Sequence, residues 1–140
     1  MTIKDYLKDT ISNCWALGHF NFSENDALRA IVESAAELKT PIFVGVSENE
    51  RKHIGIKETI ALVRAFREEF GIPIFLNADH HKNFEAVKEV VDAGYDAILA
   101  DFSKLPFEEN IKMTKQSVEY AKSKNPDIIT EGELGYVRGE

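Results

Sequence analysis

An aspartate and a histidine stand side by side after the apolar run 72–76, at Asp79 and His80. A neutral histidine binds Zn²⁺ well, and an adjacent carboxylate can act as a general acid or base near a group that the metal polarises. Neighbouring strand residues point to opposite faces, but the backbone can turn at a strand end and bring both side chains into one pocket. The alternative is a capping aspartate beside a solvated histidine, with His81 exposed in the following loop.

Carboxylates follow two other apolar runs. Asp101 could provide a second carboxylate for a metal ion, or it could cap the turn before Pro106. Glu131 and Glu133 lie two residues apart, so on an extended strand they share one face. Two carboxylates on the inward face of a buried strand are costly unless a cation or a hydrogen-bond donor faces them. A salt bridge to Arg138 or to a lysine would explain one of the two glutamates, but less easily both.

Other common catalytic patterns are missing from the sequence. It contains no glycine-rich phosphate loop and no Gly-x-Ser-x-Gly elbow, so dinucleotide-binding and serine-hydrolase functions are unsupported. The single cysteine, Cys14, has no CxxC partner and cannot form an internal disulfide. It lies in an apolar segment, so we expect a buried thiol in a reducing compartment. We expect His53 to be a surface residue.

Five apolar runs alternate with helical stripes, and these elements must position the polar residues. We expect strands at residues 14–22, 41–46, 72–76, 97–100 and 127–130, and helices at 3–13, 26–39, 57–70, 83–93 and 107–123. Segment 51–56 is less regular. The run 41–46 shows no alternation, which is typical of a strand buried on both faces in a parallel sheet. The pattern predicts an α/β fold made of βαβ units.

Two architectures fit five such units. An open doubly wound sheet would be complete with five strands, whereas a (β/α)₈ TIM barrel needs eight strands and typically about 250 residues. We expect the last residues to form a loop after a strand, with no final helix to cover the sheet. This favours the barrel. We therefore expect residues 1–140 to form one partial TIM-barrel domain that holds about the first five strands.

Composition limits the partners and the compartment. The chain has 140 residues, 44% of them hydrophobic, which is enough for one globular domain. Its net charge of −7 is spread along the chain and argues against a nucleic-acid or anionic-membrane surface. The N-terminus carries acidic residues and no long apolar run, so we expect neither a secretory signal nor a membrane span. The cytoplasm is the expected location.

Taken together, these stretches resemble the class II, metal-dependent fructose-bisphosphate aldolase family. Its barrels carry an Asp-His pair after strand three, an Asp-x-Ser…Pro-x-Glu-x-Asn-Ile segment after strand four and a Glu-x-Glu-Leu-Gly loop after strand five. The matching segments here are 79–80, 101–111 and 131–135, in the same order and spacing. Asn21 and Ser47 also resemble the family's substrate-contacting positions, so the resemblance covers essentially the whole chain.

The resemblance implies a role for each residue at the metal. Asp79 would be the acid/base that handles the proton at the aldehyde-derived oxygen, and His80 would be one ligand of the catalytic Zn²⁺. Glu133 would lie beside the metal as an alternative or outer ligand. Asp101 could hold a second cation, divalent or monovalent. The family's other two zinc histidines and its phosphate-binding loops lie in its last three strands, which this chain does not contain.

The remaining site residues would bind or support the substrate. Asn21 and Ser47 would contact the phosphorylated sugar, and Glu131 and Glu140 would support the site. The sequence departs from the family at His81, where a small residue is usual, and at the segment 137–140, where the family has a Gly-Gly-x-Glu-like loop.

The implied function is reversible cleavage of fructose 1,6-bisphosphate to dihydroxyacetone phosphate and glyceraldehyde 3-phosphate, a lyase reaction of glycolysis and carbohydrate metabolism. Tagatose bisphosphate, which differs at one stereocentre, stays open as the substrate. We expect a fragment of this length to be inactive alone and to pair in a homodimer or with a complementary barrel half, because its sheet edge and barrel interior are uncovered. The alternative is a non-catalytic α/β half-barrel module that acts as a binding or regulatory partner.

Overall fold

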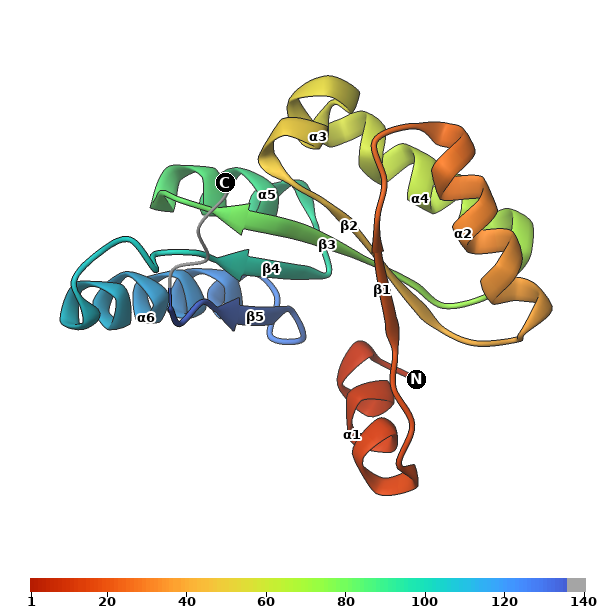
Figure 1. The fold of residues 1–140 in the computed structure, drawn as a ribbon, viewed down its shortest axis with the longest axis horizontal. Helices are drawn as coiled ribbons and strands as arrows, with labels where there is room; N and C mark the ends of the chain where they lie inside the picture. Colours follow the sequence, from red (N-terminus) through yellow and green to blue (C-terminus); the bar gives the residue numbers. More distant parts are fainter. Residues whose placement is uncertain (136–140) are drawn as a thin grey trace.

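The computed structural model of the chain describes residues 1–135 and contains one parallel sheet (Figure 1). Its strands are β1 (Gly18–Asn21), β2 (Ile42–Val46), β3 (Ile74–His81), β4 (Ala97–Ala100) and β5 (Ile129–Gly132). They are hydrogen-bonded in chain order, β1-β2-β3-β4-β5, and every neighbouring pair is parallel. Because each strand pairs with the next one along the chain, the sheet grows in a single direction, as it does in a barrel.

The helices confirm most of the expected pattern. They are α1 (Ile3–Asn13), α2 (Asn25–Glu37), α3 (Glu48–Ile54), α4 (Ile56–Phe70), α5 (Phe84–Ala93) and α6 (Phe107–Lys124). Five of them fall where helical spacing predicts them, within two residues at either end. Segment 48–54, which the apolar pattern leaves irregular, forms α3. The signal for α3 lies in its cap: Ser47 and Glu50 form a reciprocal capping box at its start.

Two expectations at the N-terminal end are wrong. The first strand is β1, four residues long, and not the segment 14–22. Cys14 is exposed and ends α1 in a left-handed conformation with φ 54°, where its N–H bonds to the Thr10 carbonyl. An apolar neighbourhood in the sequence suggested a buried thiol, but the helix ends at the surface and turns this residue outward.

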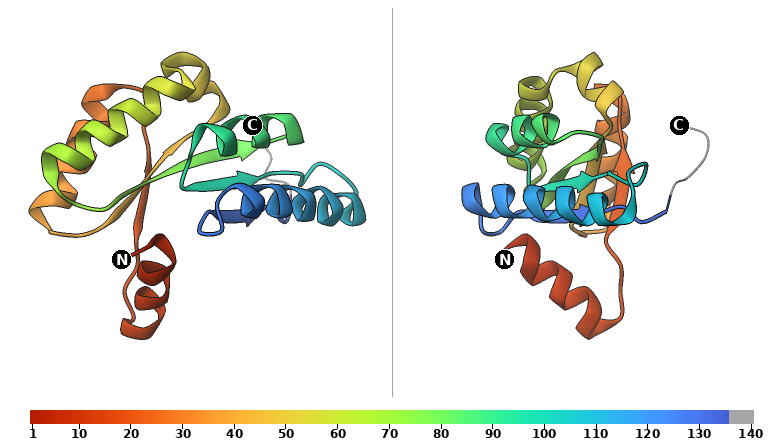
Figure 2. Two further views of the ribbon diagram at one scale, coloured as in Figure 1. Left: turned by 180° about the vertical axis from the view of Figure 1, so that it is seen from behind. Right: turned by 90° about the vertical axis from the view of Figure 1, so that its left-hand side faces the viewer.

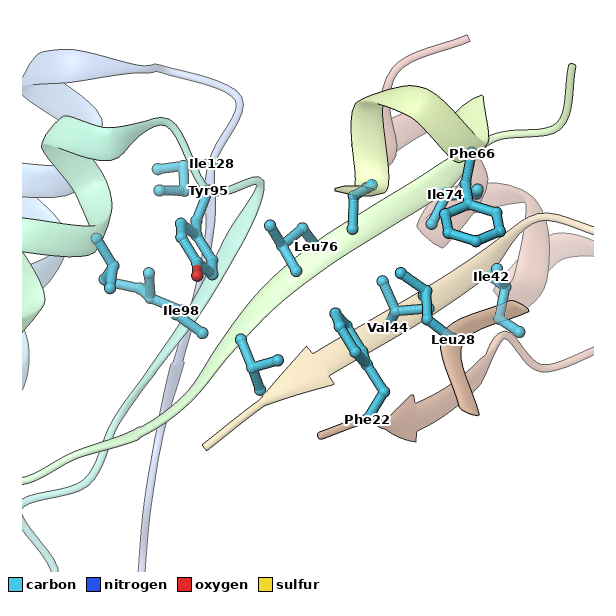
Figure 3. Packing of buried hydrophobic residues seen from close by; sticks show 14 of the residues in the cluster. Phe22, Leu28, Ile42, Val44, Phe66, Ile74, Leu76, Tyr95, Ile98 and Ile128 are labelled. Carbon is cyan, nitrogen blue, oxygen red and sulfur yellow. The ribbon is translucent and has the colours of Figure 1, made fainter. Parts of the chain in front are cut away.

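The core lies in two layers on either side of the sheet. The larger cluster fills the space between the strands and helices α2, α4, α5 and α6, and includes Leu28, Val44, Phe66 and Ile98 (Figure 3). The smaller cluster lies on the inner side, where Ile3 of α1 packs with Phe43 and Ala97. Helix α1 therefore stands apart from the outer helices and covers one end of the inner face (Figures 1 and 2).

The two edge strands are the least covered part of the sheet. Phe20 on β1 is 52% exposed and Leu38 beside it is 77% exposed, while Leu134 after β5 is 72% exposed. By contrast, all five residues of β2 are buried. Within residues 1–135, no helix combines the length and the apolar character that a membrane span requires.

Candidate active site

The end of β3 is irregular, and this irregularity creates the site. Pairing between β3 and β4 shifts register between Ala78 and His81, and His80 has a positive φ of 47°. A left-handed residue inside a strand acts as a bulge and interrupts the alternation of side chains. Without it, strict alternation from Asp79 would turn His80 to the opposite face. The bulge brings His80 Nε2 to 3.9 Å from Asp79 Oδ1.

Asp101, at the end of β4, holds the His80 ring. The Nδ1–H of His80 donates to Asp101 Oδ2 at 2.9 Å, and Asp101 Oδ1 accepts from the Ser103 backbone N–H at 3.1 Å and its hydroxyl at 2.6 Å. Partial burial raises the pKa of Asp101, but the hydrogen bonds from Ser103 and His80 outweigh it, so the pKa lies below its usual value. Asp101 therefore caps its turn with one oxygen and orients the histidine with the other.

Asp79 is oriented from the opposite side by Asn21, at the end of β1. Asn21 Nδ2 donates to Asp79 Oδ2 at 3.0 Å and lies 3.4 Å from Glu50 Oε2 on α3. Gly45 on β2 makes this approach possible, because a Cβ there would lie 2.4 Å from Asn21 Oδ1. The structure thus places Asn21 next to Asp79, and its expected substrate contact stays a prediction, whereas Glu50 was missed.

Ser47 lies in the same region, where its hydrogen bonds stabilise the start of α3. It is the N-cap of α3: its hydroxyl accepts from the Glu50 N–H at 3.4 Å, and its own N–H donates to Glu50 Oε2 at 2.5 Å. Glu50 thus links the cap of α3 to Asn21 and, through it, to Asp79. The Ser-x-x-Glu spacing is the sequence signal that could have revealed Glu50.

His81 is buried, not exposed as the sequence suggested. It has no solvent exposure, and its Nδ1 bonds to the Leu99 carbonyl at 3.0 Å. Burial and then the nearby charge of Arg51 lower the pKa of His81 to about 4. The β3 bulge explains the error, since it returns the chain to the sheet after His80 and turns His81 toward the outer helices. Arg51, which is 5% exposed, was also missed.

Glu131, on β5, and Glu133, just after it, border different surfaces instead of sharing one. Glu131 lines a hollow on the inner side of the sheet with His19 and Asn77, whereas Glu133 borders a groove between β5 and α6. The Glu133 carbonyl accepts from Asn110 Nδ2 at 2.9 Å. Glu140 lies outside the described residues, as does Arg138. His53 is exposed, as expected.

His80 is oriented so that it could provide one ligand to a metal ion. Histidine ligands commonly donate their other ring N–H to a carboxylate, which fixes the tautomer and leaves the second nitrogen for the metal. The bond from Nδ1 to Asp101 is of this kind and assigns Nε2 to the metal side. Among residues 1–135, no group of three or more His, Cys, Asp and Glu side chains is arranged to hold a metal ion. The part played by Glu133 at a metal stays a prediction.

Sequence comparison relates this chain to one family. The family described as fructose-bisphosphate aldolase class-II matches residues 1–140. A fructose-bisphosphate aldolase of Geobacillus stearothermophilus is 34% identical over 143 aligned residues, which cover 100% of this chain and 49% of that protein. One from Staphylococcus aureus (strain Mu50) is also 34% identical, with the same coverage. The chain thus spans about half the length of the relatives it matches.

Solved structures agree on the fold. The YdjI aldolase from Escherichia coli K12 superposes with a TM-score of 0.85 at 23% identity, covering 98% of this chain and 53% of that one. Fructose-bisphosphate aldolase from Campylobacter jejuni gives a TM-score of 0.81 at 16% identity, covering 95% of this chain and 46% of that one. The five parallel strands with alternating helices are therefore a partial (β/α) barrel, and the expected fold class is confirmed.

Proposed function

Because this chain belongs to the class-II fructose-bisphosphate aldolase family, we propose that it forms the first part of a metal-dependent aldolase. The proposed reaction is the reversible cleavage of fructose 1,6-bisphosphate to dihydroxyacetone phosphate and glyceraldehyde 3-phosphate. The observation that carries the proposal is the arrangement at the end of β3. A histidine oriented by Asp101 lies next to Asp79, which is itself oriented by Asn21.

Asp79 is the proposed general base of cleavage. It accepts the proton of the substrate's C4 hydroxyl, while the electron pair of the C3–C4 bond passes to the dihydroxyacetone phosphate half. In condensation it returns the proton to the aldehyde oxygen. The hydrogen bond from Asn21 holds one carboxylate oxygen, Oδ2, at 3.0 Å and leaves Oδ1 facing His80. Only 18% of the Asp79 side chain is exposed, so few water molecules compete for this proton.

His80 is the proposed metal ligand of this half of the site, through Nε2. Bound Zn²⁺ would supply Lewis-acid stabilisation of negative charge on the substrate's carbonyl oxygen. A catalytic zinc normally takes three protein ligands, so the remaining ones would come from other strands of the barrel. Asp101 has one oxygen on His80 and the other on Ser103, which favours a supporting role over direct ligation. A second cation near Asp101 and a substrate contact by Ser47 remain part of the proposal.

Aldol cleavage by the full-length protein tests this function. With Zn²⁺ present, wild type should cleave fructose 1,6-bisphosphate, and Asp79→Ala should lower kcat by roughly 10²- to 10⁴-fold, the usual contribution of a general base. Asp92→Ala, which removes an exposed carboxylate on the outer helix α5, is the matched control. Activity that survives exhaustive chelation, or that is unchanged in Asp79→Ala, would contradict the proposal. Parallel assays with tagatose 1,6-bisphosphate decide the substrate's stereochemistry.

A non-catalytic half-barrel module is the second candidate. The exposed apolar residues on both sheet edges favour it, because such surfaces mark places where another protein surface binds. The partner would be a complementary barrel half or a second copy of the chain, and either would act in the cytoplasm. Reading the gene beyond codon 140 separates the candidates: a frame that continues with two further strand-end histidines supports the enzyme, and a stop codon supports the module.

A further inference from the structure

A buried arginine lies directly behind the proposed catalytic residue. Arg51, on α3, is only 5% exposed, and charged side chains are almost never so buried unless they are paired. Burial lowers the pKa of its guanidinium, and Tyr95, Glu48, Asp79 and Glu50 act in the opposite direction. Arginine nevertheless stays charged in proteins. A fixed positive charge is therefore held beneath the carboxyl end of β3.

The guanidinium joins the ends of two strands. Its Nη1 donates to the carbonyl oxygen of Val46, the last residue of β2, and to that of Asp79 at 3.1 Å. Val46 directly precedes Ser47, the N-cap of α3. The helix that carries Arg51 therefore begins at the end of β2. The second strand end is the one that carries Asp79. One side chain thus sets the spacing between these two points of the site.

Two other polar side chains are buried in the core: His81, next to His80 on β3, and Tyr95, just before β4. Among the described residues, Arg51 Nη2 and His81 Nε2 are buried atoms without a hydrogen-bond partner. The positive charge of Arg51 acts to lower the pKa of both His81 and Tyr95. The Leu99 carbonyl can only accept, which places the proton of His81 on Nδ1 and leaves Nε2 as an acceptor. Arg51 therefore keeps an unused donor, and His81 an unused acceptor, in the buried part of the protein.

The bulge beside Asp79 needs such support. A non-glycine residue in the left-handed region costs on the order of 1 to 3 kcal/mol and persists only where the surroundings impose it. His80, with φ 47°, is that residue, and Arg51 binds the carbonyl immediately before it. His81, the residue immediately after it, is buried, and its Nδ1 bonds to the Leu99 carbonyl. The bulge is thus held before His80 by the guanidinium and after His80 by the buried His81.

From these contacts we infer that Arg51 is a positioning residue: its guanidinium, bonded to the carbonyls of Val46 and Asp79, fixes the β3 bulge and so holds Asp79 in its catalytic place. The catalytic part of this inference rests on the proposed function. The tie between the two strand ends rests on the contacts alone. Misplacing a catalytic group by about 1 Å can cost roughly 10²-fold in rate, so loss of the tie should act on kcat more than on substrate binding.

The test compares Arg51→Lys and Arg51→Met with Arg29→Met in the full-length protein. Arg29 is a suitable control because it makes exposed ion pairs with Glu33 and Glu69 on the outer helices. Arg51→Met should lower kcat by roughly 10- to 100-fold with KM changed by less than about threefold. Arg51→Lys keeps a charge and a donor but loses the guanidinium plane, so its kcat should fall between those of wild type and Arg51→Met.

Hydrogen exchange followed by mass spectrometry gives a readout that is independent of catalysis. In both Arg51 variants, amides of the segment 76–82 should exchange faster than in wild type, while amides of α6 should exchange at the wild-type rate. In Arg29→Met, all amides should exchange at the wild-type rate. Exchange that rises equally throughout the chain would show a merely structural arginine and overturn the inference, as would kcat within twofold of wild type in both Arg51 variants. If Arg51→Met does not fold, Arg51→Lys alone decides by the same criteria.

The two proposals can fail separately. If wild type cleaves no sugar bisphosphate, the proposed function is wrong, but selective exchange in segment 76–82 still supports the tie made by Arg51. Unchanged exchange there in both variants overturns the tie whether or not the enzyme is active.

Discussion

Asp101 determines which nitrogen of His80 can meet a metal ion. Its carboxylate accepts the Nδ1 proton at 2.9 Å, and the low pKa imposed by Ser103 and His80 keeps it ionised near neutral pH. A neutral imidazole carries only one N–H, so Nε2 keeps its lone pair. The family resemblance implied that Asp101 could hold a second cation, whereas its contacts favour an action through His80.

Replacing this carboxylate should weaken metal binding. Asp101→Asn keeps the size of the side chain but removes the charge that holds the Nδ1 proton, and loss of such a partner typically costs about 10- to 100-fold in metal affinity. Competition of the full-length protein with a zinc-sensitive chelating dye measures the change. Asp92→Asn on α5 is the matched control and should bind zinc as wild type does. Equal affinity in Asp101→Asn and wild type would exclude the supporting role.

The buried hydroxyl of Tyr95 should make the stability of the protein fall at alkaline pH. Burial raises the pKa of its hydroxyl. The hydrogen bond with Thr59 and the positive charge of Arg51 act against this shift, and the negative charge of Glu89 adds to it. The pKa of Tyr95 in the folded protein lies above the unfolded value of about 10. Its stabilising contribution to the free energy of unfolding is therefore complete below pH 10 and is lost as pH rises toward the folded pKa. Urea midpoints measured from pH 8 to 11 should therefore fall less steeply in Tyr95→Phe than in wild type. Parallel curves for the two proteins would contradict this account.

At the scale of elements, the short helix α3 contributes more to the site than its length suggests. It presents Glu50 toward Asn21 on one side and Arg51 beneath Asp79 on the other. Its seven residues lack a regular apolar stripe, so periodicity did not predict it. The capping box at Ser47 was visible in the sequence, but a cap says only that a helix begins and not which strand ends the helix will reach.

The cap and the expected substrate contact of Ser47 can be separated by two substitutions. Ser47→Ala removes the cap of α3 and should lower the free energy of unfolding by about 1 kcal/mol, whereas Ser47→Asn keeps a capping side chain and should cost less. If Ser47 also contacts substrate, KM should rise in both variants. Urea unfolding and steady-state kinetics measure the two effects. A normal KM in the stable Ser47→Asn protein would leave Ser47 with its capping role alone.

At the scale of the whole molecule, the open sheet edges are the dominant feature. An apolar groove of about 610 Å³ lies between β1 and α2, lined by residues that include Phe20, Ile31 and Leu38. A second groove, of about 550 Å³, lies between β5 and α6. In a closed barrel, neighbouring strands and helices would cover both edges. The half-barrel therefore exposes surface that the closed fold would bury.

The 140-residue chain studied alone should self-associate through these edges. Leu38→Lys puts a charge into the β1 groove and should shift sedimentation toward the monomer, because burying an unpaired lysine opposes association. Ile11→Lys is the matched control: Ile11 is also highly exposed, at 82%, but lies on α1. A monodisperse wild-type monomer, or equal effects of the two substitutions, would contradict association through the edges.

Sequence patterns alone predicted the five strands and every helix except α3, since burial on both faces gives the unbroken apolar run at 42–46 and burial on one face gives the helical spacing at 107–124. They also singled out Asp79 and His80 as the candidate central pair. Tertiary structure decided how the pair is held. The bulge at His80, the carboxylate of Asp101 across the strand end and the guanidinium of Arg51 behind it depend on contacts between residues 20 to 30 positions apart. Local patterning carries no information about such contacts, and so His81 was expected in solvent and Arg51 was overlooked.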